Sequence, residues 1–261
     1  MKRINLFAIA MTVVLLMAAC TTAADPTLVP APAQEQSGEE NQPTVPPTEA
    51  ATPTERATNT PVPPTDTPEP TPTPQLTVLL EDDFSDVNSG WERYNQMDGM
   101  LDYDGEGGYR MFFEISNNLF WVEKELLEQA DVIIEVDLTQ ASGGADATFG
   151  VMCRMDDNAN FYFFGITGDG QYGIGIQENW QRTWLGTGQL ETNADILPTG
   201  ETNRLRAACV GSTLSLTLNG REYLVVNDET LMDGDNFGMF IASAEEPGND
   251  VTFDNLVVYQ P

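Results

Sequence analysis

Apolar and polar residues alternate through most of the chain beyond residue 76. In residues 213–218, Leu214, Leu216 and Leu218 share one face, and Asn219-Gly220 follows as a pair that suits a tight hairpin turn. A period of two predicts half-buried β-strands, because successive side chains of a strand point to opposite faces. The same pattern recurs in residues 100–103, 109–115, 119–122, 132–138, 148–155, 205–210, 237–242 and 251–259.

Helical spacing occurs in one short segment, EKELLEQA at residues 123–130, and predicts a turn or two of helix there. Gly, Asn and Asp clusters separate the other segments. Many short antiparallel strands without interleaved helices predict an all-β fold, either a sandwich of two sheets or a large barrel. We favour an antiparallel two-sheet jelly-roll sandwich over residues 76–261, a length sufficient for one core.

Residues 1–20 have the features of an export signal. Lys2 and Arg3 precede a largely apolar run at residues 6–17, which is shorter than the roughly 20 residues that span a bilayer. The small residues before Cys20 resemble a bacterial lipoprotein box, with Met17 where that motif usually has leucine. The resemblance implies a lipidated Cys20 and a surface-exposed, extracytoplasmic protein held to the cell membrane by its N-terminal lipid. An ordinary secretory signal with an incidental cysteine is the alternative.

Residues 21–75 differ sharply in composition from the rest. They contain 14 of the 17 prolines, interleaved with threonine, alanine and glutamate, and no aromatic residue. A segment so poor in large apolar side chains cannot offset the entropy lost on ordering. We therefore predict a disordered Pro/Thr-rich stalk, with a reach between about 40 Å as a flexible coil and about 170 Å as extended polyproline II.

Charge and composition exclude several functions. The formal charge is -30, with 41 acidic and 11 basic side chains, and residues 76–261 alone carry 33 acidic and 8 basic ones. Such a surface repels nucleic acid and anionic lipid headgroups, so we expect no nucleic-acid partner and membrane contact through the lipid anchor only. The chain has no histidine. Triads and metal sites that require histidine are therefore excluded.

Four segments carry a resemblance to a known fold family. They are DDFSDVNSGW, FGVMCRMDDNANFYFFGITGDGQYGIGI, NRLRAACVGSTLSLTLNG and VTFDNLVVYQP. Together they resemble the concanavalin A-like lectin/glucanase jelly rolls of bacterial surface lipoproteins. The layout is similar to the family once called DUF1080 and now named for 3-keto-disaccharide hydrolases.

The resemblance implies the sandwich fold but leaves the activity open, because this fold carries lectins, glycosidases and structural modules. We expect a non-catalytic module that binds a polysaccharide, another glycan or cell-envelope material. The alternatives are a glycoside-processing hydrolase of the 3-keto-disaccharide type and a protein-protein adhesion or scaffold module.

Two cysteines remain in the predicted domain. Cys153 alternates in phase with Phe149 and Val151, and Cys209 with Leu205 and Ala207, so both side chains share a face with apolar residues. In an exported protein, such a pair predicts a disulfide between Cys153 and Cys209. Two free buried thiols are the alternative.

Paired carboxylates suggest a catalytic strand in one place. Glu135 and Asp137 resemble the first two acids of the E-x-D-x-E strand of family 16 glycosidases, but Thr139 and Gln140 stand where the general acid is needed. A retaining glycosidase requires that second carboxyl group with a raised pKa. We therefore favour an exposed strand face with solvated acids and predict no catalytic residue.

A structural calcium ion is the second chemical possibility. Jelly rolls of the resembled kind often hold one where the first and last strands meet, which implies Asp82 or Asp83, together with Asp254, as ligands in this chain. Unpaired surface acids are the alternative. Residues 102–107, DYDGEG, imitate the start of an EF-hand loop, but Phe113 occupies the position of its bidentate glutamate, so a hairpin turn is favoured.

The aromatic stretch at residues 158–176 predicts a hairpin around TGDGQ. Pairing sets Ile166 opposite Tyr172, Phe164 opposite Ile174 and Tyr162 opposite Ile176, so the even-numbered face is core. The odd-numbered face sets Phe163 against Gly175 and Phe161 against Gln177. Aromatic rings lying over cross-strand glycines are one interpretation of that face.

The other interpretation is a shallow sugar-binding platform on the odd-numbered face. It combines flat rings, glycines that permit close approach, hydrogen-bond donors and two tryptophans that wall one end. Its predicted residues are Met152, Arg154, Phe161, Phe163, Gln177, Trp180 and Trp184.

Overall fold

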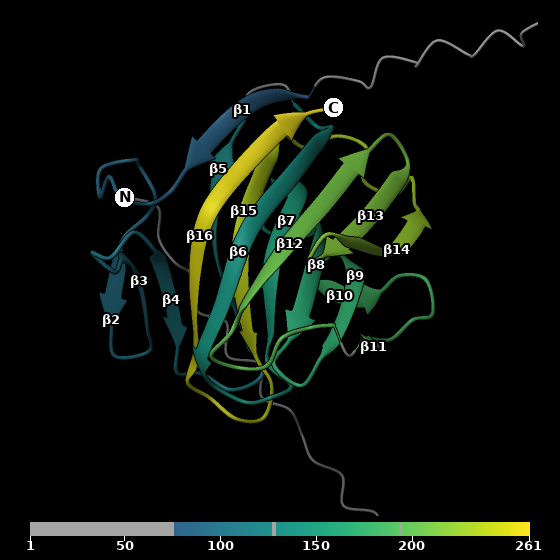
Figure 1. The fold of residues 1–261 in the computed structure, drawn as a ribbon. Helices are drawn as coiled ribbons and strands as arrows, with labels where there is room; N and C mark the ends of the chain where they lie inside the picture. Colours follow the sequence, from purple (N-terminus) through teal and green to yellow (C-terminus); the bar gives the residue numbers. More distant parts are fainter. Residues whose placement is uncertain (1–75, 127–128, 194) are drawn as a thin grey trace, which may run out of the picture. The chain divides into compact units, whose positions relative to one another are not determined.

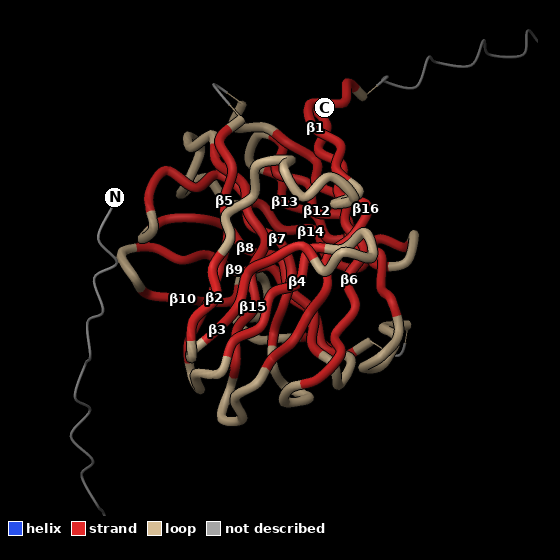
Figure 2. Tube along the Cα trace, turned by 90° about the vertical axis from the view of Figure 1, so that its left-hand side faces the viewer, coloured by secondary structure: helices blue, strands red, loops and turns tan. Residues whose placement is uncertain are grey.

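The computed structural model describes residues 76–126, 129–193 and 195–261, and the expectations for residues 1–75 lie outside this range. The described part is all-β, with strands joined by turns and loops (Figure 2). Across these residues no helix has the length and hydropathy needed to span a membrane. The predicted all-β class is confirmed.

Two antiparallel sheets face each other, and we name them sheet A and sheet B (Figure 1). Sheet A contains, in spatial order, β14 (Arg221–Asn227), β13 (Thr213–Leu218), β12 (Thr202–Val210), β6 (Val132–Ser142), β16 (Asn249–Gln260), β4 (Tyr109–Phe113), β3 (Gly99–Tyr103) and β2 (Tyr94–Gln96), with β1 (Thr77–Asp82) also paired to β16. Sheet B contains β10 (Gln181–Trp184), β9 (Gln171–Glu178), β8 (Asn160–Thr167), β7 (Thr148–Asp157), β15 (Asn236–Ser243) and β5 (Asn118–Glu125), with β11 (Glu191–Thr192) also paired to β9.

The main core lies between the sheets and is built by alternate residues of their strands. In β6, Ile134, Val136 and Leu138 are fully buried, while the residues between them face outward on sheet A. Leu214, Leu216 and Leu218 of β13 are buried in the same core, as their period of two predicts. The sandwich follows directly, because each sheet has one continuous apolar face that needs a partner.

The predicted helical turn at residues 123–130 is wrong where the structure describes it. Glu123 pairs with Gly238 and Glu125 with Asn236, so β5 continues as a strand along the edge of β15. Helix propensity is a weak local preference, and a ladder of backbone hydrogen bonds with a neighbouring strand overrides it here. Residues 127 and 128 lie outside the described residues.

The DYDGEG segment ends β3 with Asp102 and Tyr103 and continues into the turn before β4, as favoured over an EF-hand loop. The carboxylate of Asp104 accepts hydrogen bonds from the backbone N–H groups of Glu106 at 2.7 Å and Gly108 at 2.9 Å. Asp104 therefore satisfies the backbone of its own turn, which is a common role of aspartate in loops.

The predicted disulfide is confirmed. Cys153 of β7 is bonded to Cys209 of β12, and both residues are fully buried. The bond joins the two sheets through the core, across a sequence separation of 56 residues.

We expect removal of this disulfide to lower the free energy of unfolding by about 2–5 kcal/mol, because the unfolded chain gains the freedom of a long open loop. The change is a double variant, Cys153→Ala with Cys209→Ala, compared with the parent protein by denaturant titration. Reducing agent should destabilise the parent and leave the double variant unchanged. An equal effect of reductant on both proteins would contradict this assignment.

Candidate functional site

The β8–β9 hairpin has the predicted register. Ile166 pairs with Tyr172 and Phe164 with Ile174, and on the other face Phe163 pairs with Gly175. The even-numbered side chains of this hairpin belong to the main core between the sheets. The odd-numbered side chains therefore lie on the outer face of sheet B.

Glycines on that outer face allow aromatic rings to lie flat against the sheet. A Cβ atom built on Gly175 would lie 2.2 Å from the ring of Phe163, and one built on Gly173 would lie 2.8 Å from the ring of Trp184. Neither distance is sterically possible, so these two positions require glycine for the rings to remain where they are. The interpretation that an aromatic ring lies over its cross-strand glycine is confirmed for Phe163 and Gly175.

The rings belong to a second apolar cluster, separate from the main core, which we call the outer cluster. The ring of Phe163 lies 4.9 Å from Trp184 and 6.0 Å from Phe240, in edge-to-face contacts. Such contacts contribute stability beyond the area that they bury. The buried members of the outer cluster are Met152, Met155, Phe161, Phe163 and Phe240, with Leu119, Trp121, Trp184 and Ala242 packed against them.

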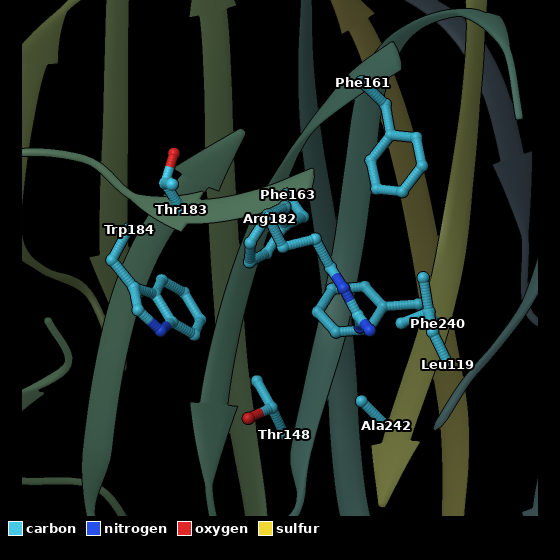
Figure 3. A pocket seen from close by; sticks show the side chains of 9 residues that line it. All are labelled: Leu119, Thr148, Phe161, Phe163, Arg182, Thr183, Trp184, Phe240 and Ala242. Atoms are coloured by element: carbon cyan, nitrogen blue, oxygen red, sulfur yellow. The ribbon is translucent and has the colours of Figure 1, made fainter. Parts of the chain in front are cut away.

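A pocket of about 220 Å³ opens in the outer cluster (Figure 3). Rings from three strands line it together with two threonines and an arginine. Its lining residues are Leu119 of β5, Thr148 of β7, Phe161 and Phe163 of β8, Arg182, Thr183 and Trp184 of β10, and Phe240 and Ala242 of β15. The pocket is smaller than the roughly 300–1,000 Å³ of drug-sized ligand sites, so it suits a single ring or a short group.

The predicted flat platform is wrong in one respect. Phe161 is fully buried and Phe163 only 6% exposed, so their rings line the pocket without forming an open surface. Met152 also packs in the outer cluster but is completely covered. Of the predicted ligand-binding residues, the structure brings Phe161, Phe163 and Trp184 together at the pocket.

Arg154 is not on the predicted surface. Gly238 of β15 pairs with Met152 and Asn236 with Met155, so β7 contains one extra residue between these pairs. Arg154 adopts the left-handed conformation there, with φ of 52°. Such a bulge reverses which face of the strand the following side chains take. Met155 therefore faces the outer cluster, where uninterrupted alternation would have placed Arg154.

The Arg154 side chain is instead buried, with its guanidinium in a ring of acceptors. It donates to the carboxylate of Asp131 at 2.8 Å and to the backbone oxygens of Gly211 at 2.6 Å and Leu231 at 3.1 Å. These acceptors come from three different loops. Arg154 therefore holds loops together and has no free donor pointing at the pocket.

Gln177 and Trp180 lie near the pocket without lining it. The side-chain amide of Gln177 donates to the backbone oxygen of Asn158 at 2.8 Å and is 5% exposed. Trp180 occupies the two-residue turn between β9 and β10, where both Asn179 and Trp180 have positive φ. That geometry is typical of a type I′ hairpin turn, and it leaves Trp180 66% exposed at the tip.

Arg182 is the charged residue of the pocket lining, and it was not predicted from the sequence; nor were Leu119, Thr148, Thr183, Phe240 and Ala242. Once Asn179-Trp180 is placed as a two-residue turn, Arg182 pairs with Gln177 and Trp184 with Gly175. Both side chains then share the outer face with Phe161 and Phe163. The signal in the sequence is the alternation of residues 181–184, which places Arg182 and Trp184 on the same face of a strand.

Glu135 and Asp137 lie on the outer face of sheet A, so the core separates them from the pocket. They are ion-paired, contrary to the predicted solvated acids: Arg204 contacts both carboxylates at 3.1 Å, and Arg206 also bonds to Glu135. Partial burial raises the pKa of Glu135, but hydrogen bonds from Arg206 and Arg204 outweigh it, and the pKa lies below its usual value.

Of the predicted calcium ligands, Asp82 is already engaged in hydrogen bonds with the protein. The first and last strands do pair, with Asp82 opposite Leu256, but the Asp82 carboxylate accepts hydrogen bonds from Trp91 Nε1 and the Phe84 N–H, both at 2.8 Å. Burial raises the pKa of Asp254, and repulsion from Asp137 and Asp83 adds to it. In the described part of the chain, no three acidic or cysteine side chains are arranged to hold a metal ion. A calcium site formed by Asp82 or Asp83 with Asp254 stays a prediction from the sequence.

Known proteins match this chain through structure and not through sequence. No protein-family model matches it, and no curated protein is significantly similar to it. A protein of unknown function with a galectin-like fold from Bacillus subtilis is similar at 10% identity and a TM-score of 0.52, over 71% of this chain and 98% of that one. The catalytic domain of a laminarinase from Thermotoga petrophila RKU-1 is similar at 8% identity and a TM-score of 0.51, over the same shares of the two chains.

These matches establish the architecture. The fold is a concanavalin A-like jelly roll. At such low identities the likeness concerns the fold and carries no residue roles across. The similarity in layout to the 3-keto-disaccharide hydrolase family stays a prediction from the quoted segments.

We expect Arg154→Met to lower the free energy of unfolding by about 3 kcal/mol or more, because several buried carbonyl oxygens lose their donor. Arg221→Met is the matched control, since the Arg221–Asp195 ion pair is exposed and its loss should cost less than about 1 kcal/mol. Denaturant titration of both variants measures the difference. Equal losses would contradict the structural role of Arg154.

We expect Glu135→Gln to flatten the pH dependence of stability in acid. A carboxyl group with a lower pKa in the folded state stabilises the fold above its unfolded pKa, and that contribution is lost as pH falls through the folded pKa. The window therefore lies below about pH 4.5, the ordinary value for glutamate. Denaturant titrations between pH 3 and 7 test this, with Glu222→Gln on β14 as control, and parallel curves for parent and Glu135→Gln would contradict it.

Proposed function

We propose that the jelly-roll domain is a non-catalytic module that binds a saccharide in the pocket of the outer cluster. The observation that carries the proposal is the combination of aromatic rings, threonine hydroxyls and an arginine around one small opening. Pyranose rings present apolar C–H faces and polar edges, so they fit sites where aromatic walls are combined with a few hydrogen-bonding groups.

The position of Trp184 supports a role in contacting the ligand. It is only partly buried, its ring lies over Gly173 and packs edge-to-face on Phe163, and its strand forms one side of the pocket. Phe163 and Gly173 thereby fix the orientation of the indole. A ligand that enters the pocket meets a wall that is already ordered, and this lowers the entropic cost of binding.

A binding role is favoured over hydrolysis by the distribution of acids. None of the nine residues that line the pocket carries a carboxylate. The paired acids Glu135 and Asp137 face away on sheet A and are held by arginines. Glycoside hydrolysis by the common mechanism requires two carboxyl groups beside the scissile bond. Because the sheets of a sandwich are separated by about 10 Å, Glu135 and Asp137 on the outer face of sheet A are too far from the pocket for this role.

We further propose that the module works outside the cell, carried on the predicted stalk and held by lipid on Cys20. The support is in the sequence, namely the apolar run before Cys20 and the proline-rich composition of residues 21–75. A disulfide between Cys153 and Cys209 fits this location, because such bonds persist in oxidising compartments.

The two tryptophans of the β9–β10 hairpin provide a matched test. We expect Trp184→Ala to weaken glycan binding by about tenfold or more, because the aromatic wall of the pocket is lost. Trp180→Ala should leave binding unchanged, since that side chain lies outside the pocket. A glycan array identifies the ligand, and titration calorimetry then compares the variants. Failure of the parent protein to bind any glycan, or equal losses in both variants, would reject the proposed site.

A further inference from the structure

Arg182 differs from every other basic residue of the domain. Within the described residues, each of the other six arginines lies within 4.0 Å of an aspartate or glutamate carboxylate. The one lysine, Lys124, donates to the backbone oxygen of Ser89 at 2.8 Å and lies over the ring of Trp91. Arg182 has no ion pair and no side-chain hydrogen bond in this part of the chain.

An unpaired arginine is unexpected in this domain. Acidic side chains outnumber basic ones by 33 to 8 in residues 76–261, so carboxylates are abundant. The neighbours of Arg182 at the pocket are instead Phe163, Phe240, Leu119 and other uncharged residues. In Figure 3 its side chain extends over the pocket toward Phe240, with the guanidinium at the far end. Arg182 is exposed by surface area, so its guanidinium is accessible to a ligand, and within the described residues no carboxylate compensates its charge.

The electrostatics of Arg182 agree with that geometry. Burial lowers the pKa of its guanidinium, whereas hydrogen bonds to carboxylates raise the pKa of Arg93 and Arg110. A guanidinium that lines an apolar pocket without a carboxylate partner gains a charge-assisted hydrogen bond when a ligand brings an anion. The guanidinium presents parallel N–H donors, which match the two oxygens of a carboxylate.

We propose that the pocket takes an acidic saccharide, whose sugar ring contacts Trp184 and whose carboxylate is bound by Arg182. This inference rests on the proposed saccharide-binding function and specifies its ligand class. The net charge of the domain repels dense polyanions, while the single uncompensated cation attracts one carboxylate at one place. The preferred ligand is thus a glycan with an isolated or terminal acidic residue, and a continuous polyuronate binds less well at low salt.

The experiment compares acidic glycans with their own neutral forms. The full-length protein is applied to an array of uronic-acid-containing and sialylated oligosaccharides, each printed beside the same oligosaccharide after its carboxyl group has been reduced to an alcohol. Calorimetry then measures the best pair. We expect the acidic member to bind about 10- to 100-fold more tightly than its reduced partner, because a hydrogen bond to a charged group contributes more free energy than one to a neutral hydroxyl.

Variants at Arg182 assign the effect to this side chain. Arg182→Met should abolish the preference for the acidic member, and Arg182→Lys should keep part of it, because lysine retains the charge but loses the paired donors. Arg221→Met on β14 removes the same charge from sheet A and should change nothing. Thermal unfolding checks the fold of each variant. Arg182 makes no side-chain hydrogen bond within the described residues, so stability should be retained.

The outcomes separate this inference from the proposed function. Binding of neutral glycans equal to or tighter than their acidic partners would overturn the acidic ligand while leaving saccharide binding intact. A preference for acidic glycans that survives Arg182→Met would overturn the role of Arg182. Absence of binding to every glycan on the array would overturn both proposals.

Discussion

The bulge at Arg154 is the constraint on which the arrangement of sheet B depends. One extra residue in β7 reverses the direction of its side chains, so that Met155 joins the outer cluster and Arg154 is buried. A buried guanidinium is tolerated only when its donors are satisfied, and here Asp131 and several backbone oxygens supply the acceptors. The bulge directly follows Cys153, whose disulfide fixes β7 to β12 in the opposite sheet. The two features together fix this end of the sandwich.

The outer faces of the two sheets have opposite chemistry. Sheet A carries arginines and acids in a connected network around Glu135, Asp137, Arg204 and Arg206. Sheet B carries the outer cluster, whose rings lie over Gly173 and Gly175. A jelly roll needs only its inner faces for folding, so a second apolar cluster on an outer face is not required by the core. This is why the outer face of sheet B is the better candidate for function.

Much of the architecture was predictable because it depends on local periodicity. The strands, the β8–β9 register and the disulfide all follow from side chains that alternate with a period of two. Predictions failed where that period is interrupted. Arg154 was misplaced because a bulge cannot be read from alternation, and residues 123–125 were misassigned because pairing with β15 overrides helical spacing. The hydrogen bond from Trp91 to Asp82 also lay beyond a pattern of period two, because it joins residues nine positions apart.

The pattern of residues along the chain was sufficient for the fold class, for the separation of core and outer faces in β8 and β9, and for the pairing of Cys153 with Cys209. These features depend on which face of a strand each side chain takes. The composition of the pocket was decided by long-range packing, because β5, β7, β8, β10 and β15 each contribute side chains to it. Tertiary structure also decided that the Arg182 guanidinium has no ion pair among residues 76–126, 129–193 and 195–261, because a missing partner becomes visible only when the neighbouring strands are in place.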